Sequence, residues 1–195
     1  MSLLQDVYNR LDAMDAKIAT LATVQPVQTA PSGSTSAAAA TAYHVNAAGP
    51  AIPGYQASAF VIQGMVWPPA SQPVTHDIDV TALNAGPADL YKTYLTAIMP
   101  APVVLVIPEP SGTALTVRLH FAELYYQSAG QRFLNVSVNG NVVLSRWDVF
   151  TAAGAAFKAV VVDFAVTADA SGVAVRVEGA GNYYPLLCGA EVLTA

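Results

Sequence analysis

The segment "RLHFAELYYQSAGQRFLNVSVNG", Arg118–Gly140, combines two alternating apolar runs, a pair of adjacent tyrosines and a turn signal. Residues 115–121 (LTVRLHF) and residues 134–138 (LNVSV) each place an apolar side chain at every second position. This period of two is typical of a strand with one buried face. Asn139-Gly140 then predicts a tight hairpin, because a type I′ turn needs positive φ at both central residues. The segment therefore predicts antiparallel strands.

The same alternation continues on both sides of this segment. It recurs in "NVVL" (141–144), "AVVVDFAV" (159–166) and "VAVRVE" (173–178), and turn clusters such as "EPSGT" and "DASG" separate the runs. No helix is expected after residue 25. Residues 43–195 are thus predicted to form an all-β domain of two packed antiparallel sheets, a β-sandwich. The pattern alone leaves jelly-roll and immunoglobulin topologies open.

The N-terminus has a different period. Apolar residues recur at alternating spacings of three and four, which predicts an N-terminal α-helical coiled-coil segment over residues 1–24. The alternative is an amphipathic helix that packs on its own domain, although an a/d stripe is narrower than the face such helices bury. Residues 25–42 are rich in Pro, Ser and Ala and predict a flexible linker. We expect a homo-oligomer, a trimer, through Leu4, Val7, Leu11, Met14, Ile18 and Leu21.

Composition excludes several classes of partner. The 195 residues carry a net charge of −5 with only 11% charged residues, and the eight Lys and Arg residues are scattered. A nucleic-acid surface needs clustered basic residues, so no nucleic-acid partner is expected. The longest apolar runs are too short to span a bilayer, and the N-terminus has no apolar block typical of a secretory signal. We therefore expect that the chain is made in the cytoplasm and is not inserted into a membrane.

Few residues suggest catalysis. His44, His76 and His120 lie in separate segments without metal-ligand spacing, and Cys188 stands alone in an apolar context typical of a buried thiol. No nucleophile elbow, phosphate loop or dinucleotide fingerprint occurs. A glycosidase would need two facing carboxylates, which no pattern here indicates. We therefore predict a binding protein that is not an enzyme, with no catalytic residue, metal or cofactor.

Aromatic residues carry the functional signal. Four of the tyrosines form two adjacent pairs, Tyr125-Tyr126 and Tyr183-Tyr184. Adjacent residues within a strand point to opposite faces, whereas at a strand end both can border a loop. A tyrosine ring packs on the apolar face of a sugar while its hydroxyl bonds a sugar hydroxyl. The alternative is that these rings cap the ends of the core.

Several motifs resemble the malectin family of carbohydrate-binding domains. They are "LHFAE" (119–123) with the tyrosine pair after it, "GQRFLNVSVNG" (130–140), "WDVF" (147–150) and "NYYPLLCGAEVL" (182–193). "YHVNAAGPA" (43–51) and "LYKT" (90–93) are similar to the opening segments of the family. The resemblance spans residues 43–193 and implies a jelly-roll-like antiparallel β-sandwich that binds oligosaccharides in a loop cleft lined by aromatic rings and an acid.

The resemblance also suggests site residues. Tyr125 and Tyr126 match the aromatic pair of the family, and Tyr183 stands where the family has an acidic ligand. Tyr94, in "LYKTYLTA", lies two residues before the position of another family aromatic. The carbohydrate-binding residues predicted in this way are Tyr125, Tyr126, Tyr183, Tyr94, Glu123 and Trp147.

A coiled-coil segment, a linker and a sugar-binding head together predict a fibre, spike or decoration protein of a bacteriophage or phage-like particle. Its expected partners are host surface oligosaccharides or polysaccharides and capsid or tail proteins, and its expected place is the virion. Several heads on one stalk would strengthen weak sugar sites by avidity. The alternatives are a structural virion component without glycan binding and a bacterial glycan-binding module, for which a cytoplasmic location stays open.

Overall fold

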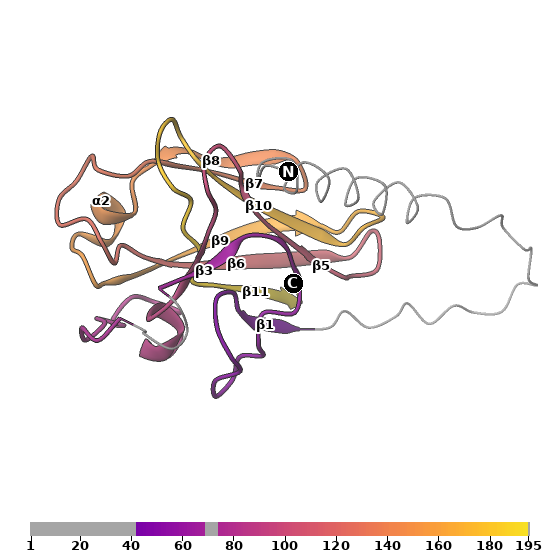
Figure 1. The fold of residues 1–195 in the computed structure, drawn as a ribbon. Helices are drawn as coiled ribbons and strands as arrows, with labels where there is room; N and C mark the ends of the chain where they lie inside the picture. Colours follow the sequence, from indigo (N-terminus) through magenta and orange to yellow (C-terminus); the bar gives the residue numbers. More distant parts are fainter. Residues whose placement is uncertain (1–41, 69–73, 195) are drawn as a thin grey trace, which may run out of the picture. The chain divides into compact units, whose positions relative to one another are not determined.

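The computed structural model describes residues 42–68 and 74–194, and within them the predicted all-β class is confirmed (Figure 1). Every ladder between its strands is antiparallel. The predicted coiled coil, residues 1–24, and all but the last residue of the linker lie outside the described residues and stay predictions. The strands are β1 (Tyr43–Asn46), β2 (Val61–Gln63), β3 (Met65–Trp67), β4 (Tyr94–Thr96), β5 (Val103–Ile107), β6 (Ala114–Ala122), β7 (Leu134–Val138), β8 (Asn141–Trp147), β9 (Ala159–Thr167), β10 (Val173–Gly179) and β11 (Gly189–Thr194).

Two sheets form the sandwich. One has the strand order β1-β11-β6-β9 and the other β2-β5-β10-β7-β8, while β3 and β4 form a separate two-stranded sheet. If β2, β3 and β4 are set aside, eight strands remain, β1 and β5 to β11. Numbered in chain order, they lie in the order first, eighth, third, sixth in one sheet and second, seventh, fourth, fifth in the other. This is the order of a jelly roll, one of the two topologies that the sequence pattern left open.

The alternation of buried and more exposed side chains along β6 shows which face of its sheet packs in the core. Val117, Leu119 and Phe121 are fully buried, and they belong to one hydrophobic cluster with Leu105 of β5 and Val136 of β7. The residues between them, such as Arg118, lie on the other face of the same sheet. The predicted hairpin is confirmed, because β7 pairs with β8 across Asn139 and Gly140, whose φ values are 46° and 76°.

The expectation of no helix after residue 25 is wrong. A 3₁₀ turn, η1, spans Ala88–Tyr91, and a short helix, α2, spans Val149–Ala153. Asp148 caps α2 by accepting the backbone N–H groups of Phe150 and Thr151, and Gly154 ends it in the left-handed conformation. A helix of five residues is too short to show an amphipathic period, so only the cap residues could have indicated it.

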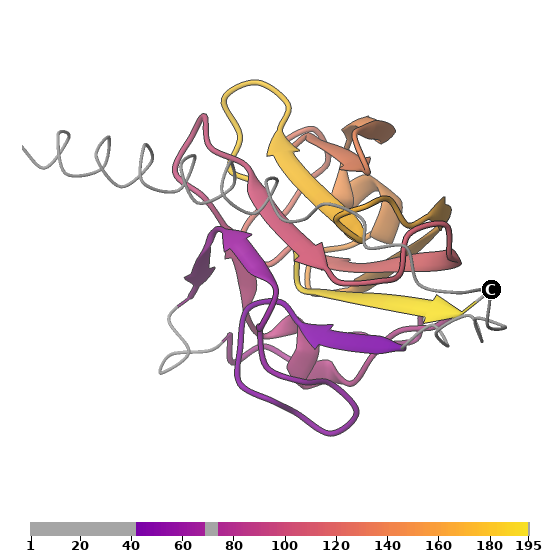
Figure 2. The ribbon, with the colours of Figure 1, turned by 90° about the vertical axis from the view of Figure 1, so that its right-hand side faces the viewer.

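The first and last strands of the sandwich are neighbours. Tyr43 of β1 is paired with Val192 of β11, and Val192 is paired with Val117 near the start of β6 (Figures 1 and 2). The first residue of β1 and the last residues of β11 therefore lie near the start of β6. The end of β6, at Ala122, lies at the opposite end of the sheet, and the tyrosine pair follows after Glu123 and Leu124.

Candidate functional site

A cleft of about 420 Å³ lies at the end of β6. The two-stranded sheet of β3 and β4 supplies one wall, because Met65 is paired with Thr96 and Trp67 with Tyr94, so all four side chains share one face. The cleft is lined by Met65, Trp67, Tyr94, Thr96, Ala97, Ile98, Tyr125, Tyr126, Arg132 and Tyr184.

Exposed aromatic rings border this cleft. Tyr125 is 70% exposed, and Trp67 and Tyr184 are each 51% exposed. The ring of Tyr125 meets that of Tyr126 edge to face, with centroids 5.0 Å apart and planes at 88°. Large apolar rings usually lie inside a protein, so several of them exposed around one cleft indicate a binding surface.

A buried ion pair supports the tyrosine pair from below. Arg132 is 4% exposed and donates from Nε to Oε2 of Glu123, which is 1% exposed, at 2.7 Å. Oε1 of Glu123 accepts the backbone N–H groups of Tyr125 and Tyr126, each at 3.0 Å. The carboxylate thus fixes the backbone of both tyrosines at the strand end, since hydrogen bonds to charged acceptors are the stronger ones.

Arg132 also ties together the separate segments around the cleft. Its Nη1 donates to the backbone oxygen of Tyr184 at 2.9 Å. Its guanidinium carbon lies 5.1 Å from the ring centroid of Tyr126 and 6.0 Å from that of Tyr94. Burial raises the pKa of Tyr94 to about 12, although the charge of Arg132 opposes this rise, so Tyr94 offers a neutral hydroxyl at ordinary pH.

The structure brings three of the predicted binding residues together, namely Tyr94, Tyr125 and Tyr126. Glu123 lies beneath them and is absent from the lining. Two other predicted residues lie outside the cleft and pack on neighbouring rings. Tyr183 contacts Phe133 with centroids 5.6 Å apart, and Trp147 contacts the buried Phe121 with centroids 5.0 Å apart.

Several residues of the cleft were not predicted. Tyr184, rather than Tyr183, faces it, because adjacent side chains point in different directions and the sequence does not say which one points inward. Trp67 and Met65 come from a strand of three residues that gives no clear alternation. Arg132 stands in the quoted motif "GQRFLNVSVNG", and as the single charged residue of that motif it was the available signal.

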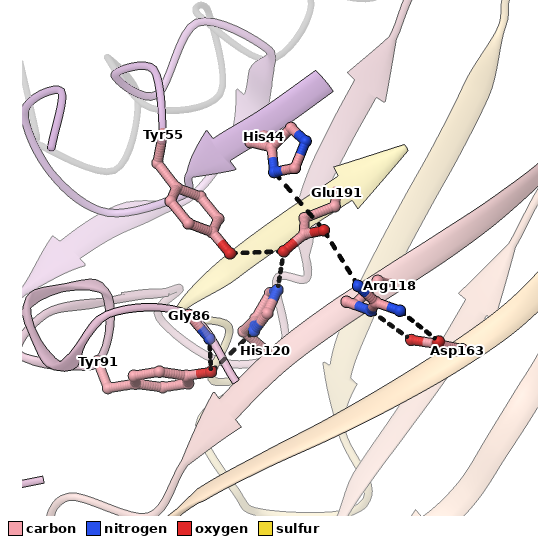
Figure 3. Close-up of polar contacts among 8 residues, drawn as sticks. All are labelled: His44, Tyr55, Gly86, Tyr91, Arg118, His120, Asp163 and Glu191. Atoms are coloured by element: carbon pink, nitrogen blue, oxygen red, sulfur yellow. Dashed lines mark hydrogen bonds and ion pairs between the residues drawn. The ribbon is translucent and has the colours of Figure 1, made fainter. Parts of the chain in front are cut away.

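A second polar cluster lies on the outer face of the β1-β11-β6-β9 sheet (Figure 3). His44, Glu191, Arg118 and Asp163 are direct cross-strand neighbours, so an imidazole, a carboxylate, a guanidinium and a second carboxylate form a row across four strands. Arg118 bonds Asp163 through Nε and Nη2, each at 2.9 Å, and lies 3.5 Å from Glu191. None of these four residues lines the cleft, and opposite charges in register stabilise the sheet.

Glu191 also ends a buried hydrogen-bond chain (Figure 3). The backbone N–H of Gly86 donates to the hydroxyl of Tyr91, which lies 2.8 Å from Nδ1 of His120. Nε2 of His120 lies 2.8 Å from Oε1 of Glu191, and Tyr55 donates to the same oxygen at 2.5 Å. Burial raises the pKa of Glu191, but the hydrogen bonds from His120 and Tyr55 outweigh it and lower the pKa to about 2. Because every member has partners, this cluster is best explained as support for the sheet.

Replacement of Glu191 by Gln is expected to remove a pH-dependent part of the stability. The pKa of Glu191 falls from its usual 4.5 to about 2 on folding, so folding favours the ionised form. Its contribution is therefore present above about pH 4.5 and is lost as the pH falls toward 2. Urea unfolding between pH 7 and 3 should show a wild-type advantage that shrinks with acid.

Asp89→Asn is the control for this experiment, because Asp89 is an exposed acid on η1 that pairs only with Lys92 among the described residues. It should change stability little at any pH. An advantage of wild type over Glu191→Gln that stays constant from pH 7 to 3 would contradict the assignment.

Other kinds of site find little support in the described part of the chain. Within residues 42–68 and 74–194, no group of three or more His, Cys, Asp or Glu side chains is arranged to hold a metal. Cys188 is buried, as predicted, and burial raises the pKa of its thiol to about 12. No helix in these ranges is both long and apolar enough to span a bilayer.

Comparison with protein families matches the Malectin domain to residues 73–184. A search of curated proteins found no significant match.

Similar solved structures come from plant receptors. The ANX2 ectodomain from Arabidopsis thaliana is 18% identical with a TM-score of 0.65, over 78% of this chain and 50% of that one. The ANX1 ectodomain from the same plant is 18% identical with a TM-score of 0.65, over 78% and 48%. A complex of the plant peptide RALF23 with FER and LLG2 matches at 16% identity and a TM-score of 0.62, over 77% and 47%. The chain thus spans about half the length of these relatives, and at such identity the likeness shows the fold alone.

Proposed function

The chain belongs to the malectin family, and from this premise we propose that it is a non-enzymatic protein that binds oligosaccharides in the aromatic cleft at the end of β6. The observation that carries the proposal is the set of exposed rings of Trp67, Tyr125 and Tyr184 around one cleft. Flat rings offer the apolar faces on which pyranose C–H groups pack, and the tyrosine hydroxyls offer hydrogen bonds to sugar hydroxyls.

Binding fits the charges at the cleft better than hydrolysis does. Glycoside hydrolysis needs two carboxyl groups on either side of the bond. Among the described residues, none that lines the cleft is Asp or Glu. Glu123, which lies beneath, is occupied by Arg132 and two backbone N–H groups. This geometry supports recognition without chemistry.

A ligand panel tests the proposal. Full-length protein would be titrated with neutral and acidic oligosaccharides and with bacterial surface polysaccharides. Peptides belong on the same panel, because one of the similar structures contains a peptide, RALF23. We expect at least one saccharide to bind, and its binding to be lost in Tyr125→Ala. Binding of peptides alone, or saccharide binding that survives Tyr125→Ala, would overturn the proposal.

A narrower part of the proposal concerns the assembly that carries the clefts. We propose that residues 1–24 assemble the chain into a trimeric fibre or spike of a phage-like particle in which several clefts face host glycans. The heptad spacing and the linker composition support this part. A structural virion component and a bacterial glycan-binding module are its alternatives, and the ligand panel separates the first of these from a receptor-binding role.

Two charged substitutions in the predicted seam should dissociate such an assembly. In full-length Leu11→Asp/Ile18→Asp, two heptad positions become charged, which a coiled-coil seam does not tolerate. Sedimentation should show a trimer for wild type and a monomer for the variant. Retention on a glycan-coated surface should fall by about 10²-fold with the loss of avidity. A wild-type chain that sediments as a monomer would contradict this part of the proposal.

A further inference from the structure

A bulge in β8 carries an arginine in a left-handed backbone conformation. The register of β8 against β7 shifts between Leu134 and Val136, so two residues of β8 face the single residue Asn135. One of these two, Arg146, has a φ of 47°. Glycine adopts this conformation without strain, whereas a residue with a side chain adopts it at a cost. The presence of an arginine at this position therefore calls for an explanation.

Neighbouring side chains hold Arg146 in place and set its direction. Its backbone N–H donates to Oδ1 of Asn135 at 2.8 Å. Its guanidinium carbon lies 4.9 Å from the ring centroid of Phe133, and Tyr183 packs edge to face against the same ring. Alternate residues of β7 are buried in the core, so Asn135 and Phe133 lie on the outer face of the sheet. The bulge thus holds the guanidinium group on that outer face, against an aromatic ring.

The charge of Arg146 is not balanced by an acid. The ranges 42–68 and 74–194 contain three other arginines, and each of them is paired with a carboxylate: Arg118, Arg132 and Arg176. Arg146 is exposed and makes no ion pair within those ranges. Glu178, which lies opposite Asn135 on the neighbouring strand β10, bonds Arg176 instead.

The contact with Phe133 does not by itself account for the arginine. A cation–π contact at an exposed site contributes no more than a left-handed conformation costs. It also uses the charge of the guanidinium but none of its five N–H donors. Arg146 therefore presents hydrogen-bond donors and a positive charge on the surface, and a ligand can use both.

Arg146 lies next to the cleft, across two segments of chain. Phe133 directly follows Arg132 and Tyr183 directly precedes Tyr184, and the cleft is lined by Arg132 and Tyr184. Each segment thus gives one side chain to the cleft and the adjacent one to the Phe133–Tyr183 contact. Cα atoms of adjacent residues are only about 3.8 Å apart. A ligand that leaves the cleft over this rim can therefore meet Arg146.

We propose that Arg146 binds an anionic group, a carboxylate or a phosphate, of an acidic saccharide whose neighbouring sugar occupies the aromatic cleft. This proposal rests on the proposed function and adds the class of saccharide. The guanidinium group donates two parallel N–H bonds to two oxygens of such an anion. The whole chain has a net charge of −5, which disfavours anions at long range, so any preference for an acidic saccharide comes from a local site.

The experiment pairs each acidic ligand with a neutral counterpart. Trisaccharides of galacturonic acid and of mannuronic acid are compared with their methyl esters, and mannotriose 6-phosphate is compared with mannotriose. Calorimetric titration of full-length protein should give about tenfold tighter binding of at least one acidic ligand than of its counterpart. The difference should shrink in about 1 M salt, which screens charges. The pair that shows the difference identifies the anion as a carboxylate or a phosphate.

Three variants test the role of Arg146. Arg146→Gly places a residue suited to the left-handed conformation, so its melting temperature should change little. It should lose the preference for the acidic ligand and keep its affinity for the neutral one. Arg146→Lys keeps the charge without the paired donors and should retain only part of the preference. Arg176→Ala is the matched control, because it removes the same charge from β10 of the same sheet, and it should keep the preference.

Failure of this proposal can be told apart from failure of the proposed function. If acidic and neutral ligands bind equally and both are lost in Tyr125→Ala, the Arg146 site is wrong and the oligosaccharide cleft stands. A preference that folded Arg146→Gly retains, or that Arg176→Ala also loses, would overturn the Arg146 site as well. Binding that needs Arg146 but survives Tyr125→Ala would support the anion site and overturn the cleft. If none of the ligands binds, both proposals fail.

Discussion

A chain that carries Tyr125→Ala and Tyr184→Ala should lose at least about 100-fold in oligosaccharide affinity, because exposed aromatic residues at the centre of a binding surface often contribute about 2 kcal/mol or more each. The melting temperature should fall by no more than about 2 °C, since substitutions of exposed side chains usually change stability by less than about 0.5 kcal/mol. The backbone oxygen of Tyr184, which accepts from Arg132, is retained in the variant. Titration and thermal melting of the same samples measure both quantities.

Tyr183→Leu is the matched control, because Tyr183 is the other member of the same tyrosine pair and packs on Phe133 instead of lining the cleft. Leucine retains an apolar group against that ring. Affinity should stay within about twofold of wild type, since a change that removes no ligand contact is worth only a few tenths of a kcal/mol. An equal loss of affinity in both variants would contradict the assignment of Tyr184, rather than Tyr183, to the site.

Arg132→Met should be the most destabilising single change considered, at about 3–5 kcal/mol, because it leaves the carboxylate of Glu123 buried without its charged partner. Glu123 is 1% exposed, so solvent cannot replace the lost guanidinium. The expected fall in melting temperature is about 6–20 °C for a domain of this size. Oligosaccharide binding should weaken as well, because the backbone of Tyr125 and Tyr126 is held by the same carboxylate.

A double variant separates the charge from the side-chain contacts. In Glu123→Gln/Arg132→Met the amide oxygen can still accept the N–H groups of Tyr125 and Tyr126, but no buried charge remains. It should recover a substantial part of the stability that Arg132→Met loses, as buried pairs replaced together often do. Chemical unfolding measures the free energies for this cycle. If Arg132→Met stays within about 1 kcal/mol of wild type, the pair does not hold the cleft together.

The sequence predicted the parts of the fold that depend on local pattern. The alternation of residues 115–121 depends on one buried sheet face, and the Asn139-Gly140 turn depends on backbone φ at two residues, so both were visible without tertiary information. The position of Tyr125 and Tyr126 at a strand end followed from where that alternation stops. The jelly-roll order required the family resemblance, because strand pairing over long separations leaves no local signal.

The rest of the cleft depends on tertiary contacts. Trp67 reaches it because β3 pairs with β4, about thirty residues further along the chain, and three residues of strand carry no readable period. Arg132 gains its role from contacts with Glu123 and Tyr184, which lie on separate segments. The choice between Tyr183 and Tyr184 depends on which side chain finds Phe133, a fact of packing alone.

The pairing of β1 with β11 places the beginning and the end of the domain next to each other. The chain enters the sandwich at Tyr43 and leaves it after Thr194, and both points lie beside the beginning of β6. The cleft lies beyond Ala122 at the end of β6, roughly 20 Å away along the strand. Any protein joined to either end is therefore attached at one end of the sandwich, and the proposed binding cleft lies at the other. Such a module can be inserted into a surface loop of another protein or repeated in tandem, with each binding face left uncovered by its support.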